Sequence, residues 1–174
     1  MTNHLLPGQP FPAIDLPDAQ GGRLRSAEFD APFMTILNVY RGLHCPRCQR
    51  QLQDIVAHRA EFDALGAKVV SISTDDQPRA LQALDEWGLG DMALGYDLTI
   101  DGARSLGLNI SETIREAEPA FFAEAAVFLI QGDGVLWGSS INSFPFLRPT
   151  AEQLLDAVRV AKERNYPPRG NVAA

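Results

Sequence analysis

Two cysteines, Cys45 and Cys48, are the only sulfhydryl groups in the chain, and they are separated by two residues. They follow the segment Tyr40 to His44, and the whole motif lies between an apolar run and a helical pattern of apolar residues. A helix N-terminus favours a thiolate, so this junction suits Cys45 as the nucleophile. Cys48 follows one turn later on the same face, where it can resolve a mixed disulfide or a sulfenic acid formed at Cys45. Pro46 fits the first helical position.

Other roles for the two thiols remain open. A structural zinc site needs four ligands, and the chain has no second cysteine pair. The nearest imidazoles are those of His44 and His58, and no histidine follows His58. A soft metal such as Cu(I) could bind the two cysteines alone, and buried inert thiols are a further alternative. Redox chemistry accounts best for the spacing, the proline and the junction together.

The composition limits the class of protein. With 174 residues, 45% of them hydrophobic and 21% charged, the chain is expected to form one ordinary globular domain. The net charge of −7 argues against nucleic acid and against an anionic membrane surface as partners. Residues 1–8 do not resemble a signal peptide, and no apolar run is long enough to span a bilayer. The expected location is therefore the cytoplasm, where thiols stay reduced and a CxxC pair can cycle.

Periodicity and turn signals predict the order of elements. Residues 1–32 predict a small hairpin, with strands near 13–16 and 22–24. A core strand over 33–40 leads into one helix over 46–65, which Gly66 ends, and a second buried strand covers 67–73. Asp75 and Asp76 are interpreted as capping residues of a helix that runs through Trp87, in preference to acid/base groups or metal ligands.

The second half of the chain is less regular. A short strand is predicted near 93–97 and one or two helical turns over 101–107. Residues 108–124 have an acidic bias and two adjacent phenylalanines, which fits either an insertion that covers the site or a surface helix. A hairpin with strands over 125–131 and 135–140 and a helix that begins near Thr150 complete the domain. The domain is expected to span 1–164, followed by a loosely ordered tail over 165–174.

This order predicts an α/β fold with a mixed central sheet, helices on both faces and an N-terminal hairpin extension. With a CxxC at the first strand-to-helix junction, it is the thioredoxin-like arrangement. Four segments carry a more specific resemblance: residues 7–12, residues 40–48 with the cysteine motif, residues 127–134, and residues 142–149. Through these the chain resembles the peroxiredoxin-like alkyl hydroperoxide reductase/thiol-specific antioxidant (AhpC/TSA) family.

The resemblance also marks departures. Typical peroxiredoxins have a threonine and a proline where this chain has Gly42 and Asn38, and an arginine where it has Ala125. Arg41 is therefore the candidate for the charge that supports the Cys45 thiolate, with a surface salt bridge as its alternative. Arg148 could supply that charge only if its loop folds back over Cys45.

Two further side chains near the motif have less specific interpretations. His44 is a candidate proton shuttle or an ordinary loop histidine. Arg47 is expected to face solvent, where it could steer anionic partners.

The resemblance implies an antioxidant oxidoreductase in which Cys45 attacks a peroxide or a disulfide, Cys48 closes the bridge, and a thioredoxin- or glutathione-type donor reduces it. A glutaredoxin-like disulfide reductase without peroxidase activity and a Cu(I)-binding thioredoxin-fold module are the alternatives. No bound cofactor or metal is expected for the oxidoreductase. Relatives often dimerise, so a homodimer stays open, although no sequence patch identifies an interface.

Overall fold

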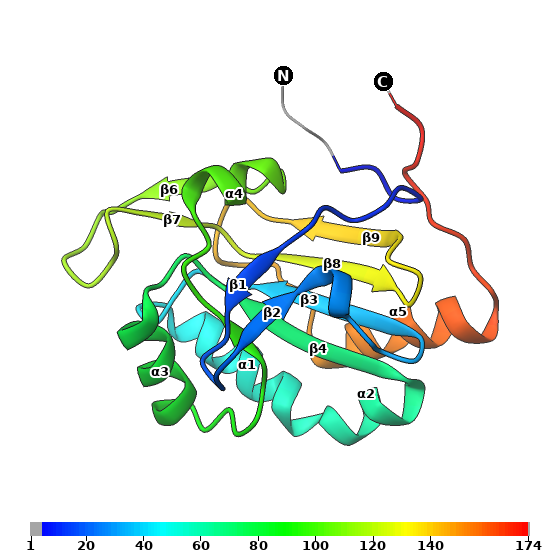
Figure 1. Cartoon of the computed structure of the whole chain (residues 1–174), viewed down its shortest axis with the longest axis horizontal. Helices are drawn as coiled ribbons and strands as arrows, with labels where there is room; N and C mark the ends of the chain where they lie inside the picture. Colours follow the sequence, from blue (N-terminus) through cyan, green and yellow to red (C-terminus); the bar gives the residue numbers. More distant parts are fainter. Residues whose placement is uncertain (1–4, 174) are drawn as a thin grey trace.

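Five strands form a mixed central sheet in the computed structural model, which describes residues 5–173 (Figure 1). In spatial order these strands are β5 (Leu94–Gly95), β4 (Ala67–Ile72), β3 (Met34–Val39), β8 (Ala126–Gln131) and β9 (Leu136–Ile141). The neighbours β5, β4 and β3 are parallel, whereas β3–β8 and β8–β9 are antiparallel. This confirms the predicted α/β fold with a mixed sheet, a βαβ half and a closing hairpin.

Strand β3 lies at the centre of this sheet, and all six of its residues are buried. Alternate side chains of a strand point to opposite faces. Met34 and Ile36 therefore enter one hydrophobic cluster, while Leu37 and Val39 enter the other. Because both faces are covered, the strand appears in the sequence as a continuous apolar run rather than an alternating one.

The two faces of the sheet are covered differently (Figure 1). Side chains from α1 (Pro46–Ala57), α2 (Arg59–Leu65), α3 (Gln77–Glu86) and α5 (Ala151–Glu163) share one cluster with β3. The other cluster contains side chains from the hairpin β1 (Asp15–Pro17) and β2 (Arg23–Arg25) and from α4 (Ile100–Ser105). Helices on both faces and the N-terminal hairpin are thus as predicted.

One predicted helix is two helices in the structure. The expected helix over 46–65 is interrupted at His58, where ψ is 12° and α1 gives way to α2. The His58 ring Nδ1 lies 2.8 Å from the Asp54 carbonyl oxygen. The apolar pattern does not register this break, because Ile55 of α1 and Phe62 of α2 belong to the same core cluster. Gly66 ends α2 with φ 75°, as predicted.

The segment 108–124 is not a surface helix. Its ends pair as a second small hairpin, with β6 (Ile110–Glu112) antiparallel to β7 (Phe121–Ala123). Phe122 is buried while Phe121 stays half exposed. Of the two interpretations of this segment, the surface helix was wrong, because only one of the two adjacent aromatic residues packs inward, as in a strand.

The C-terminal helix begins as predicted, with Thr150 as its N-cap in a reciprocal pair with Gln153. Beyond α5, the Trp137 ring Nε1–H donates to the Tyr166 carbonyl at 2.8 Å. The domain bounds 1–164 and the loose tail 165–174 stay predictions, and residues 1–4 and 174 lie outside the described range. Within residues 5–173, no helix has both the length and the apolar character needed to cross a membrane.

Candidate active site

Cys45 occupies the N-cap position of α1, at the end of the loop that follows β3. Its Sγ accepts the backbone N–H of Cys48 at 3.3 Å, and Pro46 occupies the first helical position. A helix start leaves its first N–H groups without intrahelical partners and carries a partial positive charge. The cysteine sulfur thus replaces the oxygen acceptor that usually caps a helix, in an environment that favours the thiolate.

The two sulfurs have opposite acid–base properties. The pKa of Cys45 is lowered from 9.0 to about 4, first by a hydrogen bond from the Cys48 thiol, then by the Cys48 N–H and by Arg148, against the opposing effect of burial. The pKa of Cys48 is raised well above its ordinary value, first by burial and then by its contact with Cys45. At neutral pH, Cys45 is therefore the thiolate and Cys48 the thiol that donates to it.

Arg41 lies beside the Cys45 sulfur but is held mainly by a buried carboxylate. Its Nη1 is 3.7 Å from the Cys45 Sγ, and its Nε is 3.0 Å from the Oε2 of Glu124. Glu124 is only 3% exposed, and its Oε1 accepts the Ser111 hydroxyl at 2.6 Å. The Phe122 ring of the β6–β7 hairpin lies against the guanidinium, 4.8 Å from its carbon. The hairpin segment thus fixes the side chain that sequence analysis placed near the thiolate.

Arg148 comes from the segment between β9 and α5, which folds back over the cysteines. Its Nη2 lies 3.5 Å from the Cys45 Sγ and its Nη1 lies 3.0 Å from the Cys48 Sγ. The Arg148 Nη1 also donates to the Gln51 Oε1 at 3.2 Å. The condition on which the sequence interpretation of Arg148 depended is therefore met, and two guanidinium groups flank Cys45.

The loop before Cys45 rests on a buried carboxylate that sequence analysis assigned to helix capping. Asp76 does cap α3, but Asp75 is 1% exposed and accepts the Leu43 N–H at 2.7 Å and the Arg79 Nε–H at 2.8 Å. The capping interpretation was thus wrong for Asp75, whose carboxylate points into the loop instead. Only a glycine fits opposite it, because a Cβ on Gly42, with φ 137°, would lie 2.7 Å from the Asp75 Oδ1.

Within residues 5–173, neither His44 nor Arg47 forms a side-chain hydrogen bond with a cysteine sulfur. The Nδ1 of His44 faces Arg79 at 3.5 Å, and its ring packs on Phe122 with the centroids 4.7 Å apart. Burial, followed by the charge of Arg41, lowers the pKa of His44, so the ring is neutral at physiological pH. Arg47 is exposed, as expected, and its guanidinium lies over the Phe146 ring at 4.3 Å.

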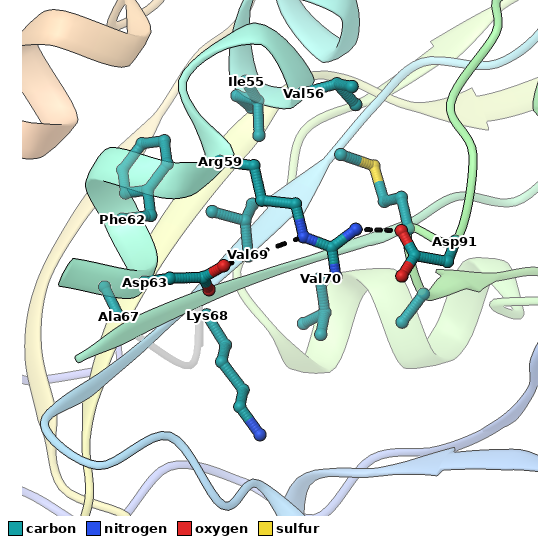
Figure 2. Close-up of a pocket in the computed structure, with 12 residues that line it drawn as sticks. Ile55, Val56, Arg59, Phe62, Asp63, Ala67, Lys68, Val69, Val70 and Asp91 are labelled. Carbon is teal, nitrogen blue, oxygen red and sulfur yellow. Dashed lines mark hydrogen bonds and ion pairs between the residues drawn. The ribbon is translucent and has the colours of Figure 1, made fainter. Parts of the chain in front are cut away.

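A separate hollow of about 230 Å³ lies between α1, α2 and β4 (Figure 2). Figure 2 shows Arg59 reaching across it towards Asp91 and Asp63, among apolar side chains that include Ile55, Phe62 and Val70. Its strand wall begins at Ala67, which pairs with Met34 at the opposite end of β3 from the site loop. No cysteine or histidine lines it, so this hollow is not part of the thiol site.

Access to the reactive sulfur is restricted. Cys45 is 1% exposed and Cys48 is fully buried, and neither forms a disulfide in this structure. Among residues 5–173, no group of three or more histidine, cysteine or carboxylate side chains could hold a metal ion. The guanidinium groups of Arg41 and Arg148 beside the sulfurs would in addition repel a bound cation.

Comparison with known proteins identifies the family of this chain. Residues 7–137 match the AhpC/TSA family over most of the chain. The chain belongs to the AhpC/TSA family. This confirms the resemblance that the cysteine motif and its flanking segments indicated.

A putative peroxiredoxin of Mycobacterium tuberculosis, present in two strains, is 32% identical over 88 residues, which are 51% of this chain and 55% of that protein. The chain thus matches about half the length of these curated relatives. Among solved structures, the peroxidoxin BcpB of M. tuberculosis superposes with a TM-score of 0.76 at 20% identity, over 92% of this chain and 100% of that one. AhpC of Enterococcus faecalis gives 0.73 at 22% identity, over 98% and 99%. These likenesses establish the thioredoxin-like fold of the AhpC/TSA chain.

Proposed function

We propose that this AhpC/TSA chain is a thiol-dependent peroxidase in which Cys45 attacks a peroxide and Cys48 resolves the product. The observation that carries the proposal is the asymmetry of the two sulfurs. Cys45 caps α1 as a thiolate, with its pKa lowered to about 4 by the Cys48 thiol, the Cys48 N–H and Arg148, whereas Cys48 stays protonated beside it. A thiolate is the nucleophilic form of cysteine, so this asymmetry sets the order of attack.

The proposed reaction has two steps. In the first, the Cys45 thiolate attacks one peroxide oxygen, so that an S–O bond forms as the O–O bond breaks, leaving a sulfenic acid and an alkoxide or hydroxide that takes up a proton. In the second, the sulfur of Cys48 displaces the sulfenic hydroxyl, and water leaves with the proton of the Cys48 thiol. One peroxide is reduced by two electrons, and an external dithiol or glutathione-type donor returns them to the disulfide.

Arg41 is proposed as a supporting catalytic residue. Its Nη1 lies 3.7 Å from the Cys45 Sγ, and a guanidinium at that distance favours a thiolate or the oxygen anion that develops in the first step. The ion pair with Glu124, 3.0 Å long, fixes its orientation before substrate arrives.

The alternatives fit the geometry less well. A disulfide reductase must bring a substrate sulfur in line with Cys45, which is 1% exposed beneath the Arg148 segment. A small peroxide needs less room. A Cu(I) module would place a cation against two guanidinium groups. Whether the chain forms a homodimer stays a prediction, which light scattering coupled to size-exclusion chromatography would test.

The deciding experiment is stopped-flow mixing of reduced, metal-free protein with hydrogen peroxide, followed by tryptophan fluorescence and by the intact mass of the product. We expect a saturable or second-order phase whose rate is much higher than that of the reaction of a free thiol with hydrogen peroxide, and a product lighter by two hydrogens. Cys45→Ser should abolish it, and Cys48→Ser should stop the reaction at the sulfenic acid. A rate no higher than that of a free thiol would exclude peroxide reduction. A sulfenic acid that appears on Cys48 would reverse the assigned order.

A further inference from the structure

Strand β4 is paired along its whole length on one side only. On its inner side, all residues from Ala67 to Ile72 pair with β3. On its outer side, within residues 5–173, only Ser71 and Ile72 pair with another strand, the two-residue β5. The first part of β4, residues 67–70, is therefore a free edge of the central sheet.

The backbone groups of this free edge point outward at every second residue. Ser71 marks the direction, because its N–H donates to the Ala93 carbonyl on the outer side at 3.0 Å. Alternate residues of a strand direct their N–H and C=O groups to the same side. The backbone groups of Val69 and Ala67 therefore point outward as well, where β5 offers no partner. Such unpaired groups are a template for the backbone of another extended chain.

The hollow shown in Figure 2 lies along this free edge. Its lining comprises all four edge residues, side chains of α1 and α2, and residues 91–93. Ile55 and Phe62 contribute apolar surface, and Arg59 lies across the hollow, paired with Asp91 and Asp63. These three charged side chains are each more than half exposed, and exposed ion pairs are weak, so the cover that they form opens at little cost.

A free edge beside an apolar hollow is the arrangement that strand addition requires. An extended peptide presents backbone donors and acceptors with the two-residue period of the edge, and its alternate side chains point to opposite sides. One of these side chains can enter the hollow while the backbone pairs with Val69. In this mode of recognition the backbone hydrogen bonds provide affinity and the pocket provides specificity. A small apolar ligand would fill the hollow but leave the edge unpaired.

Charges around the free edge favour a basic peptide over a second copy of this chain. The exposed carboxylates here are those of Asp30, Asp63 and Asp91, and they pair with only two cations, Arg59 and Lys68. One negative charge is thus in excess, on a chain of net charge −7. Two copies that met at this edge would bring like charges together, whereas a basic peptide supplies the opposite charge.

We propose that the free edge of β4, residues 67–70, docks an extended basic segment of a partner protein, which adds to the sheet as a strand and places one apolar side chain in the hollow beneath Arg59. This docking is independent of the proposed peroxidase function. The hollow begins at Ala67, which pairs with Met34 at the end of β3 opposite the thiol site. Peroxide reduction by Cys45 should therefore continue while the peptide is bound.

The test uses short synthetic peptides with a lysine at each end, in which threonine alternates with leucine, phenylalanine or isoleucine. Each has a matched control of the same sequence with N-methyl groups on alternate backbone nitrogens, which keeps the side chains but removes the donors needed for pairing. Two-dimensional amide NMR of the reduced full chain gives the affinity and the site, and amide hydrogen exchange reports on Val69. The variants are Asp91→Lys and, as a control of equal charge, Asp101→Lys, since both aspartates are exposed and paired with an arginine.

We expect at least one peptide to bind with shifts centred on residues 67–70, to slow exchange of the Val69 amide, and to lose at least about tenfold in affinity when N-methylated. Asp91→Lys should weaken binding by roughly fivefold and Asp101→Lys by less than about twofold. The peroxide rate should stay within about twofold when the peptide is bound.

The proposal is wrong if none of the three peptides shifts the β4 edge at millimolar concentration, or if the shifts lie at β9 or at the thiol site instead. Equal binding of the N-methylated peptides would show that the hollow takes a side chain without strand addition, which also contradicts it. Shifts at β4 that depend on protein concentration alone, with dimers in light scattering, would assign the edge to a second copy. Should Asp91→Lys not fold, the N-methyl comparison on wild type decides.

Discussion

The Arg41–Glu124 ion pair can be tested against an exposed pair of the same length. Both the Arg41–Glu124 pair and the Arg104–Asp101 pair are 3.0 Å long, but their side chains are 14% and 4% exposed in the first and 62% and 92% in the second. Removing one partner of a buried pair leaves an uncompensated charge, which costs about 3–5 kcal/mol, whereas exposed pairs contribute about 0–1 kcal/mol. Because Arg41 retains some access to water, we take the lower end of the first range, about 3 kcal/mol.

The measurement is urea unfolding of Glu124→Met, Arg41→Met and the double variant, followed by circular dichroism. Each single change should lower the free energy of unfolding by about 3 kcal/mol, and the double change by only about 1 kcal/mol, because no charge is then left unpaired. Arg104→Met, the exposed control, should lower it by less than about 0.5 kcal/mol. Single effects that add up to the double effect within about 0.5 kcal/mol would refute the idea that the pair holds Arg41 in place.

Three further outcomes follow from the same structure. Gly42→Ala, whose Cβ would lie 2.7 Å from Asp75 at φ 137°, should lower the melting temperature by about 4–8 °C and slow peroxide attack, whereas Gly138→Ala, whose Cβ meets nothing within 4 Å, should do neither. The rate of Cys45 alkylation should be half-maximal near pH 4 and should not change with pH around neutrality, and a half-maximal rate above pH 7 would contradict the assigned thiolate. Because the pKa of Cys45 is about 4 in the folded protein and 9.0 ordinarily, the stability that its ionisation contributes is complete above pH 9 and disappears as the pH falls to about 4. Trp137→Phe removes the 2.8 Å bond to the Tyr166 carbonyl, so hydrogen exchange should speed up after α5, and unchanged exchange would show that this contact does not order the tail.

The local part of the site was predictable because its determinants are close in sequence. The placement of Cys45, Pro46 and Cys48 at a helix start follows from spacing that a helix fixes within one turn. The positions of the core strands along the chain were predictable for a similar reason, because each is a short apolar run bounded by glycine or polar residues. His58 shows the limit of this reasoning, because the core-facing pattern continues through the break that it marks.

The rest of the site depends on contacts that no local pattern reveals. Asp75 looks like half of a capping pair, yet it accepts the N–H of Leu43, 32 residues earlier. Glu124 is one of several acidic residues in its segment, and only the pairing of β6 with β7 and its burial place it against Arg41. The sequence held two signals for the role of Asp75: Gly42 before the cysteine motif, and a second aspartate, Asp76, at the start of the same helix. Neither signal is specific for a contact between Asp75 and the loop. For Arg148, the sequence allowed a role only if its loop folds back over Cys45, and it could not show whether the loop does so.

Helix α1 links the predictable and the unpredictable halves of the site. Its first turns supply the cap at Cys45 and the thiol of Cys48, and its next turns supply Gln51 and Asp54, which bind the segment around Arg148. The second charge beside the thiolate therefore depends on docking between α1 and the start of α5, not on the central sheet. A change that loosens this docking should alter the reactivity of Cys45 while the sheet and its stability stay the same, which would make the β9–α5 segment the part of the fold that sets the chemistry of the cysteines.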